Sequence, residues 1–174
     1  FALLVRQIDP DGLVCYGRDE EHLPFILERM RVCGIHHFAS HLSRRVAHEM
    51  TMKTKAVFFG SISRNIVDCP GRTVLNLADV LKKEDKSVAG LKLPDIIERF
   101  KLAVDLKSLD NTSIYDRYTD PEKCDELRVS RFKHVQALHV LDENCMCSDK
   151  IWSSARVMRT TVHAYLSSGV SSQI

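Results

Sequence analysis

The sequence comprises 174 residues, of which 44% are hydrophobic and 28% are charged, and its formal net charge is +2. This length and apolar content are sufficient for one domain with a continuous hydrophobic core. The small net charge argues against a protein that neutralises many phosphates, because such proteins generally carry a much larger basic excess. We therefore expect no extensive contact with nucleic acid.

The apolar runs and the cysteines indicate the environment of the chain. No apolar run approaches the roughly 18–20 residues that a membrane-spanning helix requires, so no transmembrane segment is predicted. The six cysteines are expected to be reduced thiols of an intracellular protein, because a core of this size needs no disulfides. Cys145 and Cys147 form one Cys-x-Cys pair. No second pair accompanies it, so a zinc site is not predicted.

The N-terminal residues predict a short β-hairpin or an extended arm. The apolar segments 2–8 and 13–17 flank an Asp-Pro-Asp-Gly segment that starts at Asp9, and its proline and glycine positions suit a type I turn. An isolated two-stranded hairpin is only marginally stable in water, so it should lie against the helices or a partner. We predict an N-terminal hairpin or arm over residues 1–18 and a single helical domain over residues 19–174.

Two consecutive amphipathic helices are predicted after this arm. The first ends at Gly34, a residue type that suits a helix C-terminus. The second covers residues 35–52, because its apolar residues recur at helical spacing. These apolar residues, which should face the core, are Ile35, Phe38, Ala39, Leu42, Val46 and Met50.

The remainder of the chain is also predicted to be mainly helical. Residues 53–73 are the least helical part and contain a candidate strand at 56–59. Capping residues and apolar stripes predict that further helices begin near residues 74, 94, 121 and 148. The expected fold is therefore mainly α, an irregular bundle of about six helices with a short N-terminal β-hairpin or extended arm.

The polar face of the helix predicted over residues 35–52 provides the strongest candidate site. This face carries His37, His41, Arg44, Arg45 and His48. Arginine and histidine side chains in this pattern suit an anion, such as a phosphate, an acidic lipid headgroup or an acidic partner. A solvated face that binds nothing is the common alternative for an amphipathic helix.

The same face offers two histidines to a metal ion, since His37 and His41 are four residues apart. A metal site would need a third ligand. The His48-Glu49 pair is not followed by the second histidine of an H-E-x-x-H motif. No metal ligand, catalytic residue or cofactor is therefore predicted.

The function is predicted from the motifs that the sequence lacks. It contains no P-loop, no dinucleotide-binding glycine pattern and no nucleophile elbow. The first hypothesis is therefore a non-catalytic accessory subunit, a scaffold that contacts other protein subunits of a large intracellular assembly. The first residue is Phe1 and not methionine, which is compatible with a processed organellar protein, and a mitochondrial location is expected.

Two alternatives to the accessory subunit remain open. The first is a small binding module that uses the His/Arg face for a phosphate-bearing ligand, a lipid headgroup or RNA. Its affinity should fall as the salt concentration rises. The second is a metal-dependent enzyme that uses His37 and His41.

Overall fold

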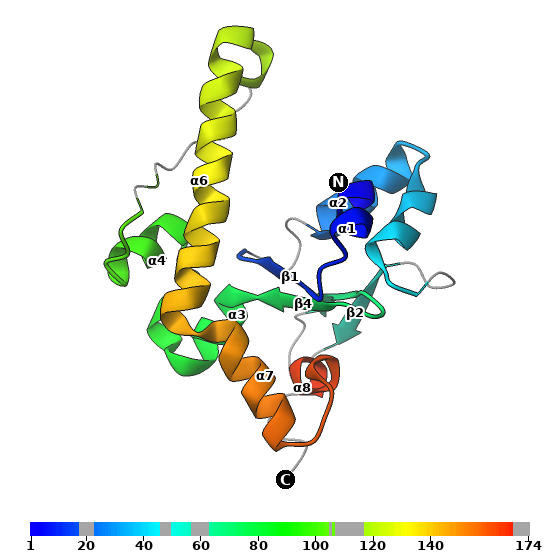
Figure 1. Ribbon diagram of the computed structural model, residues 1–174, viewed down its shortest axis with the longest axis vertical. Coiled ribbons are helices and arrows are strands. Elements are labelled where there is room, and N and C mark those ends of the chain that lie inside the picture. The colour runs from blue at the N-terminus through cyan, green and yellow to red at the C-terminus, as the bar shows by residue number, and fades with distance from the viewer. Residues whose placement is uncertain (18–22, 46–49, 57–62, 105, 107–116, 169–174) are drawn as a thin grey trace. The chain divides into compact units, whose positions relative to one another are not determined.

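The computed structural model describes residues 1–17, 23–45, 50–56, 63–104, 106 and 117–168 (Figure 1). The chain forms two compact units, one made of Phe1–Leu77 with Ile151–Ile174 and the other of Ala78–Lys150. Most of the described residues are helical, so the predicted mainly α fold class is confirmed. The predicted boundary between residues 18 and 19 lies outside the described residues and stays a prediction.

The first unit begins with three helical segments that pack together. Helix α1 (Ala2–Ile8) contacts the 3-10 helix η1 (His36–Leu42), which also contacts α2 (Leu23–Val32). Buried side chains from these segments form one hydrophobic core with residues that flank the strands, and removing this apolar surface from water stabilises the unit. The core consists of Ala2, Val5, Leu23, Met30, Ala39, Leu42, Met50 and Cys69.

Two small sheets belong to the same unit. Strand β1 (Gly12–Cys15) pairs in parallel with β4 (Thr73–Asn76), and Figure 1 shows the two strands side by side. Strand β2 (Thr51–Ala56) pairs antiparallel with β3 (Ser63–Asp68). Helix α8 (Val162–Ser168) contacts β4. The parallel pair therefore connects the N-terminal segment with a strand that also contacts the last described helix.

The predicted N-terminal hairpin is wrong. Residues Ala2–Ile8 form α1, in which Ala2 and Val5 lie three residues apart on one face and are buried in the core. Asp9 ends this helix in the left-handed conformation, with φ 49° and ψ 53°, and its N–H donates to the carbonyl of Val5. The Asp-Pro-Asp-Gly segment therefore ends a helix, and β1 pairs with the distant β4.

The prediction of one helix over residues 35–52 is also wrong after Leu42, where the helical segment ends. The 3-10 helix η1 ends at Leu42, and Ser43 is extended with φ −90° and ψ 153°. The N–H of Arg44 donates to the carbonyl of Pro70 at 3.0 Å and not to a carbonyl of the preceding turn. Met50 is nevertheless 2% exposed. The apolar pattern thus located core residues although the backbone is not one continuous helix.

The second unit is built from helices, which largely match the predicted ones. They are α3 (Leu77–Glu84), whose first residue belongs to the first unit, the 3-10 helix η2 (Lys86–Val88), α4 (Leu93–Arg99), α6 (Pro121–Cys145) and the start of α7 (Cys147–Val157). Lys150 pairs with Glu84 across 2.8 Å, which joins α7 to α3. The last predicted helix is divided into α7 and α8. None of the described helices is both long enough and apolar enough to cross a membrane.

Candidate functional site

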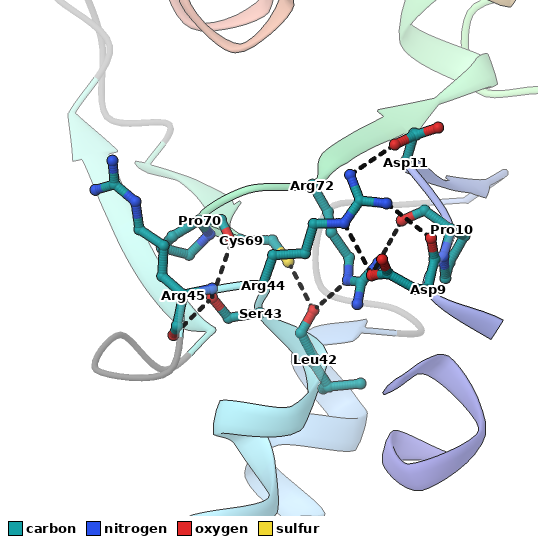
Figure 2. A network of polar contacts seen from close by, with 10 residues as sticks. All are labelled: Asp9, Pro10, Asp11, Leu42, Ser43, Arg44, Arg45, Cys69, Pro70 and Arg72. Atoms are coloured by element: carbon teal, nitrogen blue, oxygen red, sulfur yellow. Dashed lines mark hydrogen bonds and ion pairs between the residues drawn. The ribbon is translucent and has the colours of Figure 1, made fainter. Parts of the chain in front are cut away.

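A network of ionic and hydrogen-bonded groups lies where η1 ends, between the turn after α1 and the segment before β4 (Figure 2). Arg44 is held on one side of this network by two carboxylates. Its Nε lies 2.8 Å from Asp9 Oδ1, and its Nη1 lies 2.6 Å from Asp11 Oδ1. Its Nη2 also donates to the main-chain carbonyl of Asp9 at 2.7 Å. All three guanidinium nitrogens of Arg44 are therefore engaged within the protein.

Arg72 binds the same turn from the interior. The residue is 6% exposed, and its Nε donates to the carbonyl of Leu42 at 3.0 Å. Its Nη1 donates to the carbonyl of Pro10 and lies 2.9 Å from Asp9 Oδ1. The Asp9 carboxylate therefore neutralises two guanidinium groups, one of them buried, which is the arrangement that a buried charge requires.

The end of η1 is fixed by a second set of hydrogen bonds. Ser43 Oγ donates to the carbonyl of Pro70 at 2.8 Å and accepts the N–H of Arg45 at 3.1 Å. Such a hydroxyl competes with helical hydrogen bonding, which explains why the helix stops here. Gly71 has φ +83°, and a Cβ at this position would lie 2.7 Å from the Cβ of Arg44. Only glycine allows this close approach of the two segments.

The network changes the acidity of Asp9. Hydrogen bonds from Arg44, and next from Arg72, hold the pKa of the Asp9 carboxyl below its ordinary value. Because the pKa is lower in the folded protein, ionised Asp9 stabilises the fold above the unfolded-state pKa of about 3.9. That contribution is lost as the pH falls through the lower, folded-state pKa.

We therefore predict that Asp9→Asn flattens the acid limb of the stability curve. The thermal unfolding midpoint of the wild type should drop more steeply than that of the variant below about pH 4. Differential scanning fluorimetry over this acid range measures both curves. Parallel curves would show that Asp9 does not contribute to the acid sensitivity.

The predicted anion-binding residues do not share one helix face in the structure. His37 is exposed on η1 and His41 is half-buried there, and both rings contact Phe38. Arg44 is engaged by Asp9 and Asp11, whereas Arg45 is exposed and its side chain points away from these carboxylates in Figure 2. His48 lies outside the described residues. Anion binding by this set stays a prediction.

Several residues of the network were not predicted from the sequence. The sequence pattern assigns Asp9 and Asp11 only to a turn and gives no role to Arg72. Arg44 and Asp9 are 35 positions apart, and Arg72 and Pro10 are 62 apart. The two aspartates beside a proline are the only local signal, and one sequence does not show which distant arginines they bind.

Comparison with known proteins assigns the chain to a family. The family model described as DNA polymerase family B, exonuclease domain, matches residues 1–96 of the 174, which is more than half of the chain. The chain therefore belongs to this family.

One similar protein is the DNA polymerase delta catalytic subunit of Schizosaccharomyces pombe, which is 31% identical over 90 residues. The matched segment covers 49% of this chain and 8% of that subunit. The chain thus spans only a small part of the length of this relative.

Family membership corrects the functional predictions. The predictions of a non-catalytic accessory subunit and of a mitochondrial scaffold are wrong, because the family is that of exonuclease domains of DNA polymerases. The prediction of no extensive nucleic-acid contact is wrong for the same reason. A net charge sums ion-paired and free groups over the whole chain, so it does not report a local binding surface. The predicted intracellular location agrees with a DNA polymerase family.

The described residues do not fit a metal centre. Nucleases commonly use two metal ions, and carboxylates are the preferred ligands of Mg²⁺. Across residues 1–17, 23–45, 50–56, 63–104, 106 and 117–168, no three His, Cys, Asp or Glu side chains are placed to hold an ion. Burial raises the pKa of the Cys147 thiol to about 12, so it is protonated at neutral pH. No metal-dependent step is therefore assigned to these residues.

Proposed function

We propose that this chain is part of the exonuclease domain of a DNA polymerase and that it binds the DNA strand from which nucleotides are removed. The proposal is carried by the family match over residues 1–96. The hydrophobic core that α1, α2 and η1 form with the residues flanking the strands, from Ala2 to Cys69, lies wholly within this segment. The match therefore covers a packed body and not an isolated motif.

The proposed contribution of this chain is to hold and orient the strand. Removal of a nucleotide is the hydrolysis of a phosphodiester bond, in which the attacking and leaving oxygens must lie in line with phosphorus. Correct positioning of the strand therefore contributes directly to the rate. Arginine and histidine side chains serve this purpose, because they donate charge-assisted hydrogen bonds to phosphate oxygens.

The test uses the protein at its natural length and a DNA strand labelled at one end. We expect the protein to bind the strand and to shorten it stepwise in the presence of Mg²⁺, which appears as a ladder of shorter products on a sequencing gel. A strand labelled at the opposite end gives the direction of removal. A strand with phosphorothioate linkages at its unlabelled end is the matched control and should be shortened more slowly.

The outcomes separate the two parts of the proposal. Absence of both binding and shortening would overturn it. Binding without shortening would support strand binding and would overturn the exonuclease activity.

The proposal also includes a location in the cell. Membership of this family supports the proposal that the protein is intracellular and binds DNA. The mitochondrial location expected from the sequence stays a prediction. Imaging of a fluorescent fusion against nuclear and mitochondrial DNA stains would test it.

A further inference from the structure

A continuous group of rings lies on η1 and takes no part in the ionic network. The 3-10 geometry places residues three apart on the same side, so Phe38 and His41 are neighbours, with ring centroids 5.3 Å apart. The His37 ring packs against Phe38 at 4.3 Å, and the His36 ring meets His37 at 6.3 Å. We call His36, His37, Phe38 and His41 the η1 ring cluster.

The η1 ring cluster has an anchored end and an open end. Phe38 packs against the hydrophobic core and His41 is half-buried, whereas His36 and His37 are exposed. Phe38 therefore supports the His37 ring while that ring stays accessible. Exposed rings held in this way form a surface on which nucleic-acid bases stack, and pre-organisation lowers the entropic cost of binding.

Arg6 of α1 adds a cation beside the η1 ring cluster. Its Nη1 lies 3.4 Å from His41 Nε2, which is a long and weak hydrogen bond. Within the part of the chain that the structure describes, no carboxylate forms an ion pair with Arg6 or with the histidines of the cluster. A guanidinium carries five N–H donors, so Arg6 retains donors for a phosphate, which arginine binds through paired hydrogen bonds.

The two ring nitrogens of His41 differ in their hydrogen bonding. Its Nδ1 is buried and has no hydrogen-bond partner, and no other buried side-chain nitrogen or oxygen of the described residues is in this state. When Arg6 donates to Nε2, the hydrogen of the neutral ring is on Nδ1, and a buried N–H without an acceptor is unfavourable. A phosphate that takes the Arg6 donors lets Nε2 carry the hydrogen and donate to the phosphate. The buried Nδ1 then carries a lone pair in place of the N–H, and Nε2 gains a charged acceptor.

We propose that the η1 ring cluster and Arg6 bind a single-stranded segment of DNA. A base stacks on the His37 ring that Phe38 supports, and a phosphate lies between Arg6 and His41. This inference rests on the proposed function, because that function supplies DNA as the ligand. A single strand is preferred to a duplex, since its bases are free to stack on side-chain rings.

The test measures the dissociation constant of the natural-length protein for a short fluorescein-labelled oligothymidylate, by fluorescence anisotropy at low salt. The variant combines Arg6→Gln with His37→Ala, two exposed positions whose change should leave the fold intact. We expect the dissociation constant to rise about tenfold. The matched control is Arg29→Ala, which removes a positive charge from an exposed position of α2 and should change it less than about twofold.

A second probe separates stacking from charge. An oligonucleotide of the same length without bases keeps the phosphates but offers nothing to stack. In the double variant of Arg6 and His37, binding of this probe should weaken less than binding of oligothymidylate, because the probe has no base to stack on His37. Equal thermal unfolding midpoints of wild type and variant confirm that the variant is folded.

Wild-type affinity in the double variant would overturn this inference while leaving the proposed function in place. An equal loss of affinity in Arg29→Ala would also overturn it. The loss would then come from the total positive charge of the protein and not from the η1 ring cluster. Failure of the wild type to bind either probe would overturn the proposed function as well.

Discussion

Replacing Arg72 with alanine is expected to lower the free energy of unfolding by about 2–4 kcal/mol. The residue is 6% exposed, and its guanidinium binds the carbonyl groups of Leu42 and Pro10 and the carboxylate of Asp9. Alanine leaves these carbonyl groups without their donor and leaves a cavity where the side chain was. The loss should appear as faster hydrogen–deuterium exchange of the amides in α1 and η1.

Two variants serve as controls for this prediction. Arg45→Ala removes an exposed arginine whose side chain points away from the network (Figure 2), and it should change stability by less than about 0.5 kcal/mol. Arg72→Lys keeps the charge but not the planar arrangement of donors. Its loss of unfolding free energy should therefore lie between those of Arg45→Ala and Arg72→Ala. A loss below about 1 kcal/mol in Arg72→Ala would show that water replaces the guanidinium without difficulty.

Replacing Leu42 with alanine is expected to cost about 3–5 kcal/mol. Leu42 is 0% exposed and belongs to the hydrophobic core of the first unit. Its carbonyl also accepts hydrogen bonds from Arg72 and from the Cys69 thiol, so the surrounding backbone is fixed and has little freedom to fill the cavity. Urea unfolding followed by the fluorescence of Trp152, which is 49% exposed in α7, measures the loss.

The matched controls for Leu42 differ in volume and in burial. Leu42→Met keeps most of the buried volume and should cost less than about 1.5 kcal/mol. Leu3→Ala makes the same chemical change at a residue that is 59% exposed in α1 and should cost less than about 0.5 kcal/mol. If Leu42→Ala cost no more than Leu3→Ala, the core described for this unit would be incorrect.

The comparison of sequence and structure shows what apolar periodicity measures. The pattern over residues 35–52 correctly placed Ala39, Leu42 and Met50 in the core, whereas Ile35 is 43% exposed and Val46 lies outside the described residues. It did not show that the helix ends at Leu42, because that end depends on the hydrogen bond from Ser43 to Pro70, 27 positions away. Periodicity reports which side chains are buried, whereas the backbone path also depends on partners that are distant in the sequence.

The ionic network could be predicted only in part for the same reason. The sequence predicts Arg44 as a candidate anion-binding residue, but its partners are the carboxylates of Asp9 and Asp11. The Asp-Pro-Asp-Gly segment fits both a hairpin turn and the end of a helix. Packing of Ala2 and Val5 into the core favours the helix end, and local sequence does not contain that information.

The parallel pairing of β1 with β4 has a consequence for how the chain folds. Arg72 and Pro10 meet across 62 positions, and β4 also contacts α8, at Val162–Ser168. During synthesis, β1 therefore leaves the ribosome long before β4, the strand that completes its pairing. Closing so long a loop is entropically costly, and topologies with distant contacts fold slowly. Until β4 is made, the backbone edge of β1 has no strand partner, and an unpaired strand edge is exposed to pairing with other chains during synthesis.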